Sequence, residues 1–480
     1  MRDFVRVFFL VFALADIAGL SSAASSEKQC VAITHVTLVD GTGREPQTDQ
    51  TVVILDERIV SVGSAKEAVV PKQAKVIDGR GKYLTPGLWD MHVHLAGVSA
   101  DPAWSRDVLL PLLLAKGVTG VRDMGGDLEV LKTWNRQVQS GELIGPHILA
   151  SGPWLAGGGK KSPEQFPVAN AEEARAAVRE LKRRGADFIK ILTLPSREAF
   201  FAVAEEAKKQ NLPFVGHLPI EVNAAEASRA GMKGIEHLYY SSFALSVSSK
   251  EEELRKKIIQ AETNGDFAAA EQLMNEAIAT YSAEKAAALW KILQENGTSV
   301  TPTLAGIYAA GHPQDWKLEE FGYVPPKLAE EWRGIPKNEK SLARAAAVAK
   351  QAEDDWKLTR EMHHAGVNIL VGSDSLDEGM IPGFSLYDEL NQLRRTGFSP
   401  TELLAAATRG AARFAGQERD YGNVEAGKYA DLLLLTKNPL EDLSGALQDL
   451  DTVIFHGRIH DRQDLQVMLK KARETAAAVQ

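Results

Sequence analysis

Six residues whose side chains can bind metals or carry protons are spread between positions 92 and 374 of this chain. Each lies at the carboxyl end of a short apolar run, and runs of that length are typical of buried parallel strands. Polar side chains at such strand ends meet on one face of a barrel. Imidazoles, an amine and a carboxylate together are the ligand set of a two-metal hydrolytic site. The candidate metal ligands are His92, His94, Lys190, His217, His237 and Asp374.

The pair His92 and His94 stands in the segment WDMHVH. Side chains alternate along a strand, so both imidazoles are expected on the same face and able to bind one metal ion. Such pairs also arise by chance on strands. The remaining candidate ligands follow in barrel order along the chain, and this order argues against chance.

Lys190 lies inside the apolar run FIKIL, where a charged amine is costly unless it is neutralised or paired. A lowered pKa makes a lysine amine nucleophilic. The amine could form a Schiff base, or it could react with CO2 to give a carbamate whose two oxygens bridge two metals. An ion-paired structural lysine is the other interpretation. The histidine pattern favours the carbamate, so we count Lys190 as a catalytic residue as well as a ligand.

His217 and His237 each end a predicted strand, and Asp374 ends the last one in the segment VGSD. A single histidine at a strand end is more often a structural hydrogen-bonding residue than a ligand. Two on successive strands, after a lysine on the strand before, favour metal ligation. A carboxylate in such a site can bind the metal and pass a proton to a leaving amine. Asp374 is therefore the second predicted catalytic residue.

The elements that must position these residues alternate between apolar strands and amphipathic helices, the pattern of parallel βαβ units. Eight strands with helices between them fit a closed barrel better than an open sheet. We therefore predict an α/β protein with a (β/α)8 TIM barrel over residues 84–419. The predicted strands cover 83–92, 117–125, 147–152, 187–192, 213–218, 234–238, 299–304 and 368–374.

Both ends of the chain are rich in Val, Ile and Thr interrupted by turns, and we expect them to build one small β-sandwich domain from residues 25–83 plus 420–465. Two stretches, near 241–283 and 306–340, are too long for plain connections. The second holds four aromatic residues between prolines. A lid over the active site and an ordinary helical elaboration both fit these stretches.

The chain has 480 residues and a formal net charge of −9, without the basic stripe that nucleic acids or anionic membranes require. Residues 1–24 have the basic, apolar and small-residue regions of a signal peptide, which predicts an exported protein, periplasmic or secreted. A membrane anchor is the alternative, but Asp16 interrupts the short apolar run, so no stable membrane insertion is expected. The lone Cys30 excludes an intrachain disulfide.

The combined motifs PGLWDMHVHL, IKI, GHLP, EHL, GSD and the tail ATRGAARFAG…GNVEAGKYADLLLL resemble the amidohydrolase superfamily, in particular its binuclear members with a carboxylated lysine. The resemblance covers nearly all of the mature chain. It is strongest to the imidazolonepropionase-like group, which includes Xaa-Pro dipeptidases. It implies two divalent metal ions, zinc by default, and a hydroxide between them as the nucleophile. It also implies one metal on His92, His94 and Asp374, the other on His217 and His237, and Lys190 as a carbamate bridge.

The chain departs from that group after the third strand. The group carries a Gly-Gly-His-Gly stretch there whose histidine contacts the substrate carbonyl, whereas this chain reads Ala156 to Lys160 without a histidine. Carbonyl polarisation then falls to the metal alone or to another residue near the barrel mouth. The candidate substrate-binding residues are Tyr239, Tyr240, Trp154 and Lys160. Position 220 is Ile, where deaminases and imidazolonepropionases place a Glu, which argues against those activities.

These observations predict a metal-dependent amidohydrolase that cleaves a C–N amide or peptide bond in a small-molecule substrate such as an N-acyl amino acid or a dipeptide. Hydrolysis of a lactone or phosphoester on the same site is the nearest alternative. A non-catalytic metal-binding homologue is an alternative of a different class. The pattern leaves the oligomeric state open, including a homo-oligomer.

Overall fold

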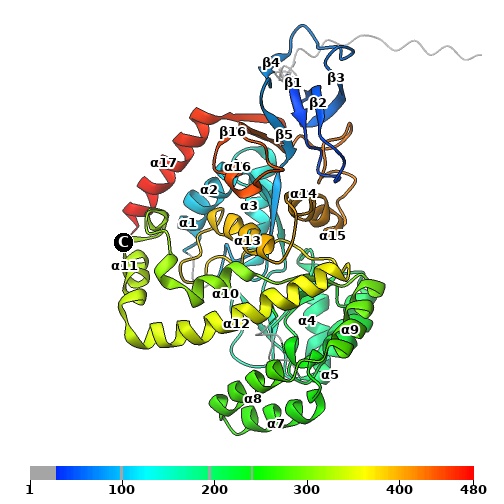
Figure 1. Ribbon diagram of the computed structural model, residues 1–480, viewed down its shortest axis with the longest axis vertical. Helices are drawn as coiled ribbons and strands as arrows, with labels where there is room; N and C mark the ends of the chain where they lie inside the picture. The colour runs from blue at the N-terminus through cyan, green and yellow to red at the C-terminus, as the bar shows by residue number, and fades with distance from the viewer. Residues whose placement is uncertain (1–28, 98–100, 193–195, 239–241, 480) are drawn as a thin grey trace, which may run out of the picture.

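The computed structural model describes residues 29–97, 101–192, 196–238 and 242–479. A sheet built from both chain ends stands above a larger body of parallel strands and helices (Figure 1). This confirms the predicted α/β class, the β-sandwich sheet from both ends and the barrel-like parallel core. The predicted signal peptide, residues 1–24, lies outside the described residues. Within those residues, no helix combines the length and apolar character needed to cross a membrane.

The terminal sheet joins the two ends of the chain through antiparallel pairing of β5 with β15, where Thr85 lies opposite Leu433. Alternate residues of its strands, such as Val31 and Ile33, are fully buried in a small core of their own. The described strands are β1 (Cys30–Leu38), β2 (Gln47–Leu55), β3 (Arg58–Ser64), β4 (Lys75–Asp78), β5 (Tyr83–Pro86), β15 (Leu432–Leu435), β16 (Leu450–Phe455) and β17 (Arg458–Asp461).

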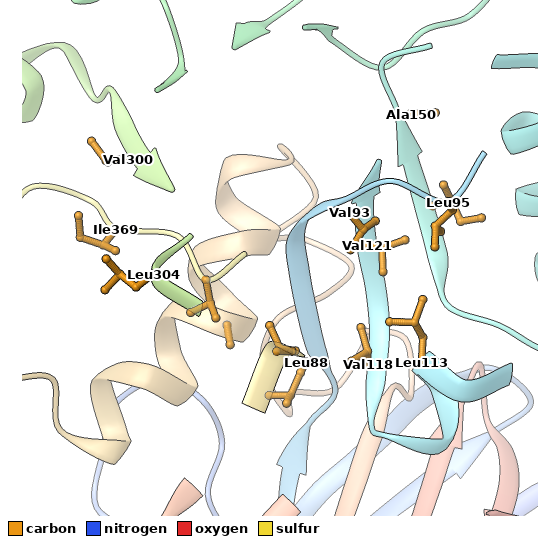
Figure 2. Packing of buried hydrophobic residues seen from close by; sticks show 14 of the residues in the cluster. Leu88, Val93, Leu95, Leu113, Val118, Val121, Ala150, Val300, Leu304 and Ile369 are labelled. Carbon is orange, nitrogen blue, oxygen red and sulfur yellow. The ribbon is translucent and has the colours of Figure 1, made fainter. Parts of the chain in front are cut away.

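The first three barrel strands pair in parallel in chain order and the next four do so in a separate sheet, which short β9 (Trp154–Ala156) and β10 (Gln165–Pro167) extend beside the fourth barrel strand. Their apolar side chains pack with the surrounding helices into the main core, as Leu88, Val118, Val121 and Leu113 show in Figure 2. The barrel strands are β6 (Leu88–Val93), β7 (Val118–Asp123), β8 (His147–Ala150), β11 (Ile189–Ile191), β12 (Phe214–Gly216), β13 (Gly234–Glu236) and β14 (Ser299–Thr301).

The predicted eighth strand closes the ring but is not a regular strand. Single bridges join Ile369 to Val300 and Ser375 to Val93, so the segment lies between β14 and β6. The backbone N–H of Asp374 donates to the carbonyl of His92 at 2.8 Å. Asp374, which lies between the two bridges, has a φ of 57°, in the left-handed region that interrupts an extended strand.

The predicted first strand, residues 83–92, is divided in two. β5 belongs to the terminal sheet, and β6 begins the barrel after Pro86 and Gly87. A Cβ at Gly87 would lie 2.2 Å from the hydroxyl oxygen of Thr119, so only glycine allows the two segments to pass so closely. One continuous apolar run therefore serves two sheets.

The helices follow the amphipathic segments between the strands, with side-chain caps such as Asn170, which accepts from the backbone N–H groups of Glu172 and Glu173. The described helices are α1 (Pro102–Trp104), α2 (Leu110–Ala115), α3 (Leu128–Ser140), α4 (Ala171–Arg183), α5 (Arg197–Lys209), α6 (Ala224–Arg229), α7 (Glu251–Thr263), α8 (Phe267–Ala279), α9 (Ala283–Asn296), α10 (Leu304–Gly311), α11 (Pro326–Gly334), α12 (Glu339–His364), α13 (Phe384–Arg395), α14 (Pro400–Ala405), α15 (Ala411–Phe414), α16 (Leu443–Leu447) and α17 (Arg462–Ala478).

The two long stretches have different places in the fold. The first forms α7 and α8, which pack on each other around their own small apolar cluster at the lower edge of Figure 1. In the second, Phe321, Tyr323 and Trp332 are buried in the main core, and the indole N–H of Trp104 donates to the carbonyl of Tyr323 at 3.1 Å. These aromatic side chains pack inside the protein and do not cover the barrel mouth.

Candidate metal centre

All six predicted ligands line one cavity of about 340 Å³ at the carboxyl ends of the barrel strands. They reach it from β6, from β11, from the residues that follow β12 and β13, and from the closing segment near Asp374. Sequence positions far apart thus meet as predicted. The lining consists of His92, His94, Gly97, Trp154, Glu164, Lys190, Leu192, His217, His237, Asp374, Leu376 and Asp377.

The carboxylate of Asp374 is the centre of the group. Its Oδ1 lies 3.2 Å from Nε2 of His92 and 3.4 Å from Nε2 of His94, and its Oδ2 lies 3.7 Å from Nδ1 of His237. Donor atoms of His92, His237 and Asp374 all lie within 4.8 Å of one another. The rings of His217 and His237 are 4.8 Å apart between centroids. Distances of this size allow single cations to bind between these side chains.

The backbone at three of the strand ends is held in a costly conformation. His237, Thr303 and Asp374 have φ angles of 61°, 51° and 57°, which side chains other than glycine adopt rarely. Each such residue costs about 1–3 kcal/mol, and strain of this kind gathers at functional sites. Two of these three residues, His237 and Asp374, contribute an imidazole and a carboxylate to the cavity lining.

A buried ion pair beneath the cavity orients His92. Nδ1 of His92 lies 3.0 Å from Oε2 of Glu236, which also accepts from the Arg122 guanidinium at 2.8 Å. Because a carboxylate only accepts, the proton of the imidazole is on Nδ1, and Nε2 carries the lone pair. The sequence analysis missed this role of Glu236 and Arg122, although a charged residue inside each apolar run, VTGVRD and GIE, was the available signal.

This tautomer tests whether the site fits a cation. The lone pair on Nε2 of His92 faces the Asp374 carboxylate oxygen at 3.2 Å, and the buried nitrogen has no hydrogen-bond donor. Two acceptors at that distance repel each other unless a proton or a cation lies between them. The residues present therefore fit a divalent metal ion bound by Nε2 of His92 and the carboxylate of Asp374.

Thr303 orients His237 in the same way. The Thr303 hydroxyl donates to the carbonyl of Pro302 at 2.8 Å, so it accepts from Nδ1 of His237 at 2.7 Å. The proton of this imidazole is thereby fixed on Nδ1, and Nε2 is the deprotonated nitrogen. Thr303 was not among the predicted site residues, because nothing in the segment SVTPTL distinguishes its hydroxyl from that of Thr301.

Electrostatics keeps most of the imidazoles neutral, as metal ligation requires. Burial, with the nearby Lys190, lowers the pKa of His92 and of His217 well below the ordinary value. Burial also lowers the pKa of His237 to about 4. Although burial opposes it, the hydrogen bond and charge of Asp374 raise the pKa of His94.

Lys190 is 1% exposed on β11. Burial lowers its pKa to about 8, although the negative charges of Glu236 and Asp374 oppose that shift. At pH 7 about a tenth of such amines are uncharged, compared with fewer than about one in a thousand for an ordinary lysine. The position therefore supplies an amine that is both reactive and next to the candidate ligands.

The tentative substrate residues have separate outcomes. Trp154 lines the cavity, with its ring centroid 6.1 Å from that of His94. Lys160 is exposed to solvent and is not part of the described lining. Tyr239 and Tyr240 lie outside the described residues. The lining also contains Glu164, five residues past the predicted Gly-rich stretch, which the sequence analysis did not select.

The chain is similar to known proteins in sequence and in fold. The sequence model of the Amidohydrolase family matches residues 83–460. Ochratoxinase of Aspergillus niger is 27% identical over 88% of this chain and 84% of its own length. Its crystal structure aligns with a TM-score of 0.63 and 23% identity, over 91% of this chain and 96% of that one.

Two further relatives span most of the chain. Imidazolonepropionase of Symbiobacterium thermophilum is 26% identical over 79% of this chain and 82% of its own length. The structure of a Xaa-Pro dipeptidase with bound methionine in its active site aligns with a TM-score of 0.64 and 22% identity, covering 90% of this chain and 100% of that one. Because the family match extends from β5 through β17, this chain belongs to the amidohydrolase family.

Proposed function

We propose that this protein hydrolyses a C–N amide or peptide bond in a small-molecule substrate with the help of two divalent cations, zinc by default. The observation that carries the proposal is the set of four imidazoles, most of them kept neutral, a lysine of lowered pKa and an anionic carboxylate around one cavity. The similarity to ochratoxinase and to a Xaa-Pro dipeptidase supports the proposal, because the name dipeptidase denotes an enzyme that hydrolyses a peptide bond.

In this proposal each residue has a defined task. His92, His94 and Asp374 would hold one cation, His217 and His237 would hold the other, and Lys190, as a carbamate, would be a ligand shared by the two. Cations held there supply Lewis acidity toward the carbonyl oxygen and a nucleophilic water at neutral pH. Glu236 and Thr303 fix the imidazole tautomers, so the ligating nitrogens need no rearrangement before substrate binds.

Asp374 is also the proposed proton carrier. Although burial opposes it, the nearby His237, His94 and Lys190 lower the pKa of its carboxyl, which keeps Asp374 ionised and ready to accept a proton from the attacking water. It can then deliver that proton to the leaving nitrogen, which must be protonated before an amide bond breaks. The Trp154 ring forms one wall beside the substrate.

The first test is the metal content of the mature protein purified without chelator, followed by a substrate panel of dipeptides, N-acyl amino acids, lactones and phosphoesters. About two metals per chain with turnover of amides supports the proposal. Turnover confined to lactones or phosphoesters would move the activity to that class. No metal and no turnover, even after reconstitution with zinc and bicarbonate, would contradict the enzyme assignment.

We further propose that residues 1–24 direct export and are removed.

A further inference from the structure

A second cavity of about 180 Å³ adjoins the first and shares His217, His237, Asp374 and Asp377 with it. It lies between α10 and α12, which pack against each other (Figure 1). Apart from one carboxylate, its remaining walls are largely apolar, formed by Leu238, Pro302, Ile307 and Ala310. A substrate whose reacting bond lies at the shared residues therefore has room for one arm in each cavity.

The carboxylate in the second cavity is Asp355, on α12. It is 4% exposed, and among the described residues no hydrogen bond or ion pair to it occurs. A buried charge without a counter-charge is costly for the folded state. Burial, together with the charge of Asp354, raises the pKa of Asp355 well above the ordinary value, which expresses the same cost.

The helix itself does not need this carboxylate. The buried face of α12 includes Ala352, Trp356, Thr359 and Met362, and Asp355 falls on that face at helical spacing. An apolar or amide side chain would satisfy the packing at this position. A buried carboxyl group that does not contribute to helix packing is unfavourable for folding, and such exceptions are often found at functional sites.

The charge of the two cavities indicates what Asp355 could bind. Besides Asp355, carboxylates of Glu164, Asp374 and Asp377 line them, whereas Lys190 is the only lysine or arginine in the described lining. The three short internal ranges outside the described residues contain no lysine or arginine either. The described lining therefore holds several carboxyl groups that can pair, in their ionised form, with a cationic group of a substrate, while its one amine, Lys190, already has a proposed role at the metal site.

We propose that Asp355 is a specificity-determining residue that binds a positively charged group, an ammonium or a guanidinium, at the end of one arm of the substrate. The apolar walls cover the aliphatic part of that arm, and the charged end forms an ion pair with the carboxylate. This inference rests on the proposed amide hydrolysis and adds the substrate class: amides or dipeptides with a basic side chain.

The substrate test uses isosteric pairs that differ only in charge. The metal-loaded enzyme is assayed with Ala-Arg against Ala-citrulline, and with Arg-Ala against citrulline-Ala. We expect kcat/KM to be about ten- to hundredfold higher for the arginine member of one pair, the range given by a charged hydrogen bond. In Asp355→Asn this ratio falls to about 1, while turnover of the citrulline member stays within about threefold.

Two variants sharpen the test. Asp354→Asn is the matched control, because Asp354 precedes Asp355 on the same helix but lines neither cavity. This variant removes one negative charge and is expected to keep the preference for arginine. Gly306 lines the second cavity, and a Cβ at this position would meet nothing within 4 Å, so Gly306→Leu is expected to place its side chain in the cavity and abolish the preference with Asp355 still present. Asp355→Asn replaces a buried carboxyl group that is costly to ionise by an uncharged amide of the same shape, so the variant is expected to be at least as stable as the wild type.

A binding measurement separates this inference from the proposed function. Argininamide should raise the Tm of the wild type more than citrullinamide does, and Asp355→Asn should abolish that difference. Turnover of both members of each pair at equal rates would overturn the inference and leave amide hydrolysis intact. Absence of all turnover would contradict the proposed function, and the Tm comparison would still decide the role of Asp355: equal shifts with both amides would overturn it.

Discussion

Thr303→Val tests how the metal centre is assembled. The variant keeps the shape and β-branching of Thr303 and removes the hydroxyl that accepts from Nδ1 of His237 at 2.7 Å. The buried imidazole N–H then loses its hydrogen bond to the Thr303 hydroxyl, which costs about 1–3 kcal/mol. The imidazole can avoid this cost by moving its proton to Nε2, but that removes the lone pair that binds metal.

Either outcome weakens binding at the position of His217 and His237. Loss of a hydrogen bond that orients a ligand typically lowers metal affinity about 10–100-fold, equivalent to about 1.4–2.7 kcal/mol, and this agrees with the cost of the buried N–H. Thr303→Ser is the matched control, since it restores the acceptor at the same backbone position.

The assay is competition with a chelator of known affinity, together with metal content after dialysis. We expect Thr303→Val to lose one of two metals under conditions in which the wild type and Thr303→Ser keep both. Circular dichroism and Tm establish that the variant is folded. A folded Thr303→Val that holds two metals with wild-type affinity would refute the argument that Thr303 sets the tautomer of His237.

Further predictions concern the other members of the site. Asp374→Asn should keep most of its metal through the remaining amide oxygen and lose nearly all turnover, and full activity would exclude Asp374 as the proton carrier. Glu236→Gln removes the carboxylate that forms the buried ion pair with the Arg122 guanidinium and should lower the free energy of unfolding by about 3–5 kcal/mol, measured by denaturant titration. An unchanged midpoint would contradict the importance of this pair. Because the pKa of Lys190 is lowered to about 8, the neutral fraction of its amine should rise about tenfold per pH unit below pH 8 and level off above pH 8. The rate of reconstitution by zinc at a fixed concentration of dissolved CO2 should follow this neutral fraction. A rate that does not depend on pH, or that is unchanged in Lys190→Ala, would count against the carbamate.

Much of the site was predictable from the sequence because a single rule of barrel architecture determines where its residues lie. Residues at the carboxyl ends of parallel barrel strands must meet, so His92, Lys190 and His217 could be assigned to one site without knowing any helix position. The same rule places the closing segment near Asp374. It does not reveal that this segment lacks regular pairing, because the left-handed backbone at Asp374 follows from tertiary packing and not from local preference.

The residues that sequence reasoning missed act through side-chain contacts. Thr303 and Glu236 matter because of which imidazole nitrogen they reach, and that depends on the register of neighbouring strands. Lys160 was selected for its position after the third strand, but its side chain is exposed and is not part of the described cavity lining. Asp355 comes from a helix far along the chain, and only its place on a buried helix face marked it as unusual.

The charges below and above His92 form an alternating series that explains why this site should be built around cations. Arg122 is paired with Glu236, Glu236 accepts from Nδ1 of His92, and Nε2 of His92 faces the anionic Asp374. Each neighbouring pair is attractive except the last, where a lone pair meets a carboxylate. The one repulsive contact in this buried series is therefore between Nε2 of His92 and the Asp374 carboxylate, and a cation bound between these two groups removes the repulsion. Metal should therefore stabilise the folded protein as well as serve the reaction, by about 2.7 kcal/mol at a free concentration a hundredfold above its Kd.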